Sequence, residues 1–312
     1  MPLRRKAVID VGTNSVKLFV ADVRGGSIQP LREESTQTRL GRGFYEDHLL
    51  QPDAIAQTAQ AVGTYAAQAR DLGAESLRII ATSAARDAIN AADLLKALGH
   101  ATGVPVEVIS GEQEAAWVCQ GVLSDPRLHN GGIVIMDLGG GSTEFILAGG
   151  DLPQRSRSFP LGTVRLLEQH PHSDPPLPVE LARCRSFVSD FLQREVVPFL
   201  EEGWKGQDHN RPQTLIGTGG TATILARMDG GLTGYDREQI EAQTLDPARV
   251  TWHVESLWGQ TLAQRQSVSG LPPNRADVIL TGVVIYEAVM RELLLNRLNV
   301  STRGLRWAAL MD

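Results

Sequence analysis

The sequence predicts an α/β protein made of two similar halves that face each other across a ligand-binding cleft. Segments typical of strands and of helices alternate along the chain, which indicates sheets with parallel strands covered by helices. Two apolar strands end in closely related phrases, VIDVGTNSVKL from position 8 and VIMDLGGGSTEF from position 134. Three residues recur between the phrases at a constant offset: Asp10, Gly12 and Ser15 in the first match Asp137, Gly139 and Ser142 in the second.

The first half predicts three consecutive strands, followed by helices and strands in alternation. Pro52 opens an amphipathic helix whose apolar residues recur at helical spacing. The phrase TSAARDAINAADLLKAL is interpreted as one continuous helix, and SGEQEAAWVCQGVL as another. The expected strands span residues 7–11, 16–23, 28–38, 77–81 and 106–109, and the amphipathic helix spans 52–70.

The second half repeats this plan loosely. The phrase GTGGTATIL predicts a glycine turn that enters a helix, and the segment 229–249, which holds three glycines, is interpreted as an exposed excursion. The closing phrase RGLRWAALMD predicts a last helix. The other expected elements are strands at 133–137, 143–148, 155–159, 214–216 and 299–302, and helices near 162–169, 179–200, 254–266 and 275–295.

Composition excludes several classes of protein. The net charge of −6 argues against a protein that coats nucleic acid, although a cleft can be locally positive and bind an anion. Asp10 interrupts the first apolar run, so no signal peptide is predicted, and no stretch approaches the roughly 20 apolar residues of a spanning helix. Cys119 and Cys184 are the only cysteines, which fits a reduced compartment. We therefore expect a soluble, cytoplasmic protein without membrane or nucleic-acid partners.

Three glycine-rich turns predict a phosphate site, because glycine lets several backbone N–H groups converge on one anion. The turns GTNS at 12–15 and GGGS at 139–142 follow strands, whereas GTGGT at 217–221 opens a helix whose dipole also favours anions. Ordinary hairpin turns and an exposed Lys17 are the alternative interpretation. The candidate phosphate-binding residues are Gly12, Thr13, Asn14, Ser15, Lys17, Gly139, Gly140, Ser142, Gly219 and Gly220.

The two related phrases differ in the charge that follows each turn. Lys17 follows Asp10 at the position where Glu144 follows Asp137. The paired carboxylates Asp137 and Glu144 suit Mg²⁺, with Mn²⁺ as a substitute, since Mg²⁺ binds through one or two carboxylates together with waters and substrate phosphates.

Two further side chains are candidates for catalysis. Ser110 and Gln113 predict a capping box, and the helix dipole accounts for Glu112, but neither effect accounts for Glu114. Glu114 begins an otherwise apolar helix face, as a partly desolvated general base would, although a solvent-facing rim glutamate is the alternative. Arg86 follows a strand, where its guanidinium could bind phosphate oxygens bidentately.

Six ordered motifs resemble those of the exopolyphosphatase and guanosine pentaphosphate phosphohydrolase family. They are VIDVGTNSVKL, ATSAARDA, ISGEQEA, VIMDLGGGSTEF, GTGGTATIL and STRGLRWAAL, and together they span almost the whole chain. The resemblance implies two ribonuclease-H-like domains of the actin, Hsp70 and acetate and sugar kinase superfamily, flanking a cleft. It places the first domain at residues 1–125 plus 303–312 and the second at 126–302.

The resemblance also implies roles for residues. Glu114 matches the catalytic base, Arg86 a phosphate ligand, and Asp137 and Glu144 the metal-associated acids. Asp10 matches too, either ordering the first turn or helping to position metal-bound water. Gln113 replaces the first acid of the family's SGxEEA motif. Because superfamily relatives return the chain to the first lobe, we expect the final helix, about 304–311, to pack on the first domain.

The implied activity is Mg²⁺-dependent hydrolysis of a terminal phosphoanhydride, and the first hypothesis is an exopolyphosphatase acting on inorganic polyphosphate. The alternatives are a guanosine pentaphosphate phosphohydrolase, a regulator that binds an alarmone or nucleotide without turnover, and a sugar or acetate kinase. We also expect a homodimer. Short or medium chains should be preferred and processivity on long chains should be low, because a net charge of −6 leaves few basic residues to retain a long polyanion.

Overall fold

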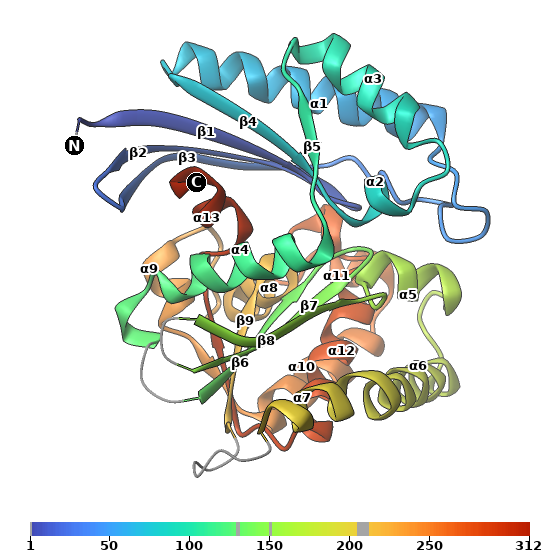
Figure 1. Cartoon of the computed structure of the whole chain (residues 1–312). Coiled ribbons are helices and arrows are strands. Elements are labelled where there is room, and N and C mark those ends of the chain that lie inside the picture. Colours follow the sequence, from blue (N-terminus) through green and yellow to red (C-terminus); the bar gives the residue numbers. More distant parts are fainter. Residues whose placement is uncertain (1, 129–131, 150–151, 205–211) are drawn as a thin grey trace.

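Two β-sheets, one from each half of the chain, are stacked with helices between and outside them (Figure 1). The computed structural model describes residues 2–128, 132–149, 152–204 and 212–312. Within these residues, no helix combines the length and the apolar character needed to cross a membrane.

The first sheet has the strand order β3-β2-β1-β4-β5. A tight turn joins β1 to β2, with the Gly12 N–H donating to the Ser15 carbonyl at 3.0 Å. Strands β1 to β3 are antiparallel, whereas β4 and β5 run parallel to β1. The strands are β1 (Arg4–Val11), β2 (Ser15–Arg24), β3 (Ser27–Gln37), β4 (Ser76–Ala81) and β5 (Val106–Val108).

Helices cover the outer face of this sheet, and one prediction about them is wrong. The phrase expected to form one helix forms two, α2 (Ser83–Asp87) and α3 (Ala91–Thr102), because the backbone is extended at Ala88. The Asn90 side chain both accepts from the Leu50 N–H at 2.9 Å and donates to the Leu50 carbonyl at 3.0 Å. This tertiary contact fixes the break, while α1 (Pro52–Asp71) and α3 pack against the strands in one apolar core.

The second sheet repeats the topology of the first and explains the recurring motif. Strand β6 pairs antiparallel with β7 as β1 does with β2, and β9 runs parallel to β6 as β4 does to β1. The order is β10-β11-β9-β6-β7-β8. The strands are β6 (Gly132–Leu138), β7 (Thr143–Gly149), β8 (Leu152–Phe159), β9 (Thr214–Thr218), β10 (Thr244–Leu245) and β11 (Arg297–Val300).

The outer face of the second sheet carries an extensive apolar core, centred on helix α12 (Ile279–Glu292), which is buried from Ile279 to Met290. The expected helix at 275–295 begins later than predicted, because Pro273–Arg275 forms a 3₁₀ turn. Segment 229–249 is not a simple excursion, since it contains α9 (Arg237–Glu241) and β10, which pairs with β11. The remaining helices are α5 (Thr163–Gln169), α6 (Pro178–Phe191), α7 (Val197–Trp204), α8 (Gly219–Asp229), α10 (Pro247–Trp258) and α11 (Leu262–Arg265), with a π-helical stretch at Leu192–Val196.

Two helices fill the space between the sheets. Helix α4 (Gly111–Leu123) packs on β7 and β8, and α13 (Leu305–Met311) packs on α4, β1 and β2. A third apolar core results, in which Trp117 and Trp307 lie among residues of both sheets. The prediction that the final helix packs on the first domain is confirmed, whereas the exact domain boundaries stay a prediction.

Gly121 allows the two interlayer helices to touch. A Cβ atom at this position would lie 2.2 Å from the Gly304 carbonyl oxygen, at the start of α13. A rigid backbone atom cannot yield as a side chain would, so α13 would have to move away from α4.

We therefore expect Gly121→Ala to lower the free energy of unfolding by about 1–3 kcal/mol, because overpacking a well-filled contact forces backbone shifts. Urea denaturation monitored by circular dichroism measures this change. The matched control is Gly99→Ala in α3, where no atom lies within 4 Å of the new Cβ. That variant should gain up to about 1 kcal/mol from helix propensity. Equal stabilisation of both variants would contradict the packing argument.

Candidate active site

A cavity of about 400 Å³ lies between the two sheets, where the first strands of both halves end. The three glycine turns predicted from the sequence converge on it from β1, β6 and β9. Every predicted site residue except Arg86 lines this cavity. The predicted residues that line the cavity are Asp10, Gly12, Thr13, Asn14, Ser15, Lys17, Glu114, Asp137, Gly139, Gly140, Ser142, Glu144, Gly219 and Gly220.

The turns of the two halves are in direct contact at the centre of the cleft. A Cβ atom at Gly141 would lie 2.4 Å from the Tyr45 hydroxyl, 2.5 Å from Ser83 Oγ and 2.8 Å from Thr13 Oγ1. Only a residue without a side chain leaves room for these hydroxyl groups. The backbone of GGGS is thus held against the GTNS turn, as a shared anion site requires.

Four carboxylates face the same cavity; Asp10, Glu114 and Glu144 are buried, and Asp137 is half-buried. The pKa of Glu114 rises to about 7, chiefly because of desolvation and in spite of the attraction of Arg86. Burial also raises the pKa of Asp137, and it raises that of Glu144 well above its usual value with the help of the Glu114 charge. The four acids are Asp10, Glu114, Asp137 and Glu144.

The side chain of Glu114 is fixed from two directions. The Ser110 hydroxyl accepts from the Gln113 N–H at 3.2 Å and so caps the helix that carries Glu114. Arg86, at the end of the short helix α2, donates to Glu114 Oε2 at 2.6 Å and to the Ile109 carbonyl at 3.0 Å. The structure therefore shows Arg86 as the partner of the candidate base, and its predicted role as a phosphate ligand stays a prediction.

Glu144 lies deeper in the wall than Glu114. Its Oε1 atom accepts from the Ser142 hydroxyl at 3.1 Å and from the Ser158 hydroxyl at 2.7 Å. These bonds hold one carboxylate oxygen and leave the other available to a ligand of the cavity.

Cations that the sequence did not single out also reach the cavity. Lys17 is joined there by Arg227, Arg275 and Arg306. Burial lowers the pKa of Lys17, and it lowers that of Arg275 to about 10. Among the described residues, the Arg275 guanidinium has no hydrogen-bond partner, although Asp277 is close enough to act on its charge. The sequence predicts Arg275 only as the first residue of the helix at 275–295, so no local signal marks it as a cavity residue.

Contacts across the cleft hold the two halves together on one side. Arg39 Nη1 lies 2.8 Å from Asp277 Oδ2, and Arg165 Nη2 lies 3.1 Å from Asp87 Oδ2. Arg165 also donates to the Gly141 carbonyl at 2.8 Å. These contacts bridge the two halves beside the cavity.

Two lobes with duplicated glycine turns, buried acids and converging cations define a phosphate-binding protein of the two-domain α/β class. Comparisons with known proteins agree with this class. The sequence pattern of the Ppx/GppA phosphatase family matches residues 19–312. The chain belongs to this family.

Individual relatives extend over nearly the whole chain. Exopolyphosphatase 2 of Mycobacterium tuberculosis is 35% identical over 307 residues, which cover 94% of this chain and 92% of the relative. The crystal structure of the Aquifex aeolicus member of the Ppx/GppA family is 29% identical, with a TM-score of 0.79 over 99% of this chain and 97% of the other. An exopolyphosphatase from Cytophaga hutchinsonii is 25% identical, with a TM-score of 0.87 over 99% of this chain and 97% of the other. The two-domain, actin-like fold expected from the sequence is thereby confirmed.

The position of Glu114 yields a direct test of its role. Glu114→Gln keeps the shape of the side chain and removes the proton acceptor, so kcat for phosphate release should fall by about 10²–10⁴-fold. Binding of the substrate, measured by calorimetry, should change little.

The matched control is Glu112→Gln, an exposed position in the same first helical turn. Its kcat should stay close to that of the unaltered protein. Near-normal turnover by Glu114→Gln would show that Glu114 is not the base.

Proposed function

We propose that this protein is an exopolyphosphatase that hydrolyses the terminal phosphoanhydride bond of inorganic polyphosphate. The observation that carries the proposal is a buried carboxylate, Glu114, with a pKa of about 7, on the wall of a cavity formed by three glycine turns. Relatives named exopolyphosphatase at up to 35% identity, over most of the chain, support the same reaction.

The residues of the cavity can carry out this hydrolysis. Glu114 accepts a proton from the attacking water, and a base works best when its pKa lies near the working pH. Arg86 holds the Glu114 carboxylate in one orientation. Turn N–H groups and the ammonium of Lys17 stabilise the charge on the transferred phosphoryl group. Phosphoryl transfer depends mainly on positioning and electrostatics, so these groups are of the types that the reaction requires.

The acids fit a divalent cation, which we include in the proposal. Within the described residues, no three His, Cys, Asp or Glu side chains form a preassembled metal cage. Mg²⁺ does not require one, because it binds through one or two carboxylates plus waters and phosphates. Asp137 and Glu144, with Asp10 beside them, would hold the ion. When bound, Mg²⁺ or Mn²⁺ would neutralise charge on the substrate phosphates.

A second candidate substrate is guanosine pentaphosphate. A relative from Vibrio cholerae named guanosine-5'-triphosphate,3'-diphosphate pyrophosphatase is 27% identical over 309 residues, covering 96% of this chain and 57% of that protein. Both substrates present a terminal phosphoanhydride, so one cavity could accept either. Phosphate release measured with both substrates side by side decides between them, and binding without release from either would favour an alarmone-binding regulator.

Location and assembly complete the proposal. Cys119 and Cys184 are both buried and free, which supports a reducing, cytoplasmic location. We further propose that the protein forms a homodimer and has no nucleic-acid or membrane partner, as expected from the sequence.

Removal of divalent ions should abolish phosphate release. We expect activity to vanish in a chelator and to return when Mg²⁺ or Mn²⁺ is added in excess. Asp137→Asn should raise the Mg²⁺ concentration needed for half-maximal rate and lower that rate, since an amide is a weaker ligand for a hard cation. Full activity in the chelator would refute the metal assignment.

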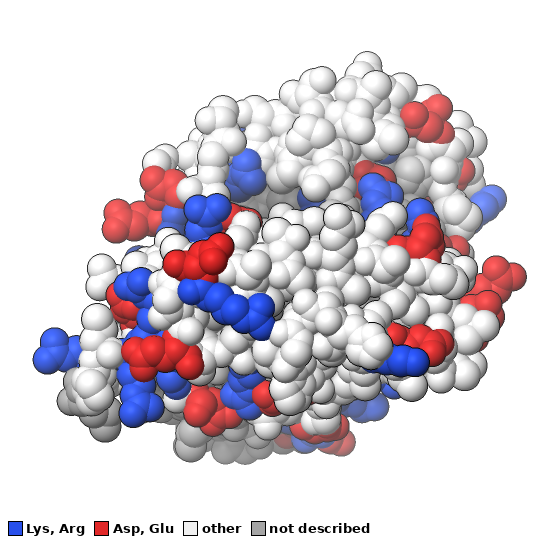
Figure 2. Space-filling view, turned by 90° about the horizontal axis from the view of Figure 1, so that it is seen from above, with Lys and Arg blue, Asp and Glu red and all other residues white. Residues whose placement is uncertain are grey.

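Long polyphosphate should be degraded with low processivity. Four arginines outside the cavity lining are already paired with acids: Arg39 with Asp277, Arg42 with Asp53, Arg155 with Glu202 and Arg165 with Asp87. On the face drawn in Figure 2, Lys and Arg side chains lie interspersed with Asp and Glu, without a continuous basic band. Retention of a polyanion needs such a band.

At limiting enzyme, gel electrophoresis should therefore show a ladder of intermediate lengths. Full-length substrate that disappears directly into phosphate and a small remnant would contradict this prediction. Such a result would be expected if dimerisation assembled a continuous basic band from two subunits.

A further inference from the structure

The cavity extends well beyond the glycine turns, along strands β2 and β3. Every second residue of β2 from Ser15 to Phe19, namely Ser15, Lys17 and Phe19, lines the cavity. In the paired register, Lys17 lies opposite Ser35 and Phe19 lies opposite Glu33. Four residues of strand correspond to roughly 13 Å, so Glu33 marks an end of the cavity distant from the first glycine turn.

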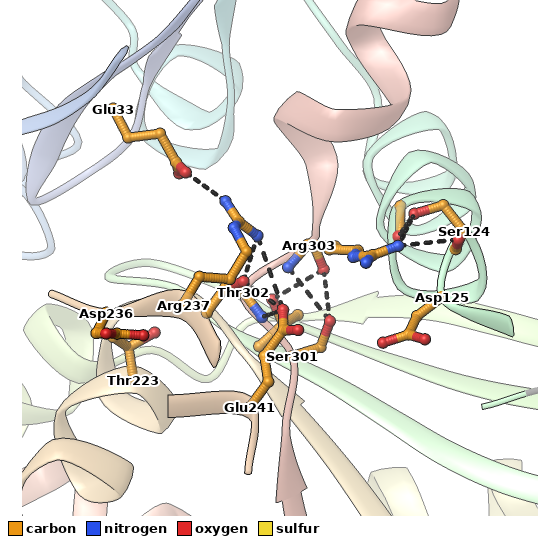
Figure 3. Close-up of polar contacts among 12 residues, drawn as sticks. Glu33, Ser124, Asp125, Thr223, Asp236, Arg237, Glu241, Ser301, Thr302 and Arg303 are labelled. Carbon is orange, nitrogen blue, oxygen red and sulfur yellow. Dashed lines mark hydrogen bonds and ion pairs between the residues drawn. The ribbon is translucent and has the colours of Figure 1, made fainter. Parts of the chain in front are cut away.

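An ion pair between the two halves lies at that end. The Glu33 carboxylate on β3 pairs with Arg237 on α9, and its other oxygen lies 3.7 Å from Arg306 Nη2. Figure 3 shows the Arg237 side chain reaching from α9 toward Glu33. Tyr235, which is half exposed, lines the cavity near the pair.

The Arg237 side chain is held in this position by neighbours on the second half. It donates to the Thr302 hydroxyl and lies 3.7 Å from Glu241 Oε1, while its guanidinium packs over the Trp307 ring at 4.8 Å. Glu241 in turn accepts from the Thr302 N–H at 3.2 Å and pairs with Arg127 at 2.9 Å. Thr302 lies just before α13, and Arg127 lies just after α4. The ion pair is therefore anchored where the chain passes between the halves (Figure 3).

We propose that Glu33 is a specificity-determining residue that ends the phosphate-binding cavity and favours short phosphate chains over long ones. This inference rests on the proposed exopolyphosphatase function. A short chain fills the cavity from the acids toward Lys17 without reaching Glu33. A longer chain brings its phosphates against the Glu33 carboxylate, which repels them and also keeps Arg237 and Arg306 occupied.

Substitutions of the two partners in the ion pair should shift KM for long-chain polyphosphate in opposite directions. Glu33→Gln removes the repelling charge and frees two arginines, so KM for long-chain polyphosphate should fall by about three- to tenfold. Arg237→Gln leaves the carboxylate with less compensation, so the same KM should rise. KM for tripolyphosphate and kcat on both substrates should change little in either variant. High salt should reduce both effects on KM.

The experiment measures kcat and KM of the full-length protein on tripolyphosphate and on long-chain polyphosphate. The control is Glu107→Gln on β5, which removes an equal charge from an exposed pair with Arg78 in the same half, away from the cavity. Thermal unfolding of each variant shows whether it is folded. The long-chain to short-chain ratio of kcat/KM should rise only in Glu33→Gln.

Two results overturn the inference. An unchanged ratio in Glu33→Gln would mean that long chains do not approach this carboxylate. A shift in the same direction for Glu33→Gln and Arg237→Gln would mean that the pair acts as a mechanical clasp, without charge selection. Failure of the proposed function has a different signature, since the unaltered protein would then release phosphate from neither substrate.

Discussion

Holding several negative charges in one enclosed cavity is the constraint on which the rest of this structure depends. A buried carboxylate is costly unless a cation or a hydrogen-bond donor compensates it. Here Arg86 compensates Glu114, and two serine hydroxyls compensate Glu144. The compensation is incomplete, because burial still leaves the pKa values of Glu114, Asp137 and Glu144 raised. Under the proposed function, a divalent cation bound with the substrate would supply the missing compensation.

The duplicated hairpin supplies the opposite charges at equivalent positions. In the first half Asp10 pairs in register with Lys17, and in the second half Asp137 pairs in register with Glu144. The same hairpin thus presents an acid and a cation in the first half, and two acids in the second half. The first copy suits a phosphate oxygen and the second suits a metal ion, which is a physical reason for one chain to use the same device twice.

Features that depend on local sequence were predictable, and features that depend on distant contacts were not. Apolar strands, glycine turns and the cap at Ser110 are encoded within a few residues, and the structure contains them. The break between α2 and α3 depends on Asn90 contacting Leu50, far away in the chain. Arg275 likewise reaches the cavity, and Arg237 reaches Glu33, only because the second half folds around α12 and against the first sheet. No periodicity or motif in their own segments indicates this.

The location of α4 makes the candidate base a shared component of both halves. Glu114 lies on α4, which packs on β7 and β8 of the second sheet. Its ion-pair partner Arg86 belongs to α2, beside the first sheet. Arg86 also donates to the Ile109 carbonyl just before that helix. The orientation of the Glu114 carboxylate therefore depends on contacts with both halves at once. Under the proposed function, neither half alone would hold the base in place.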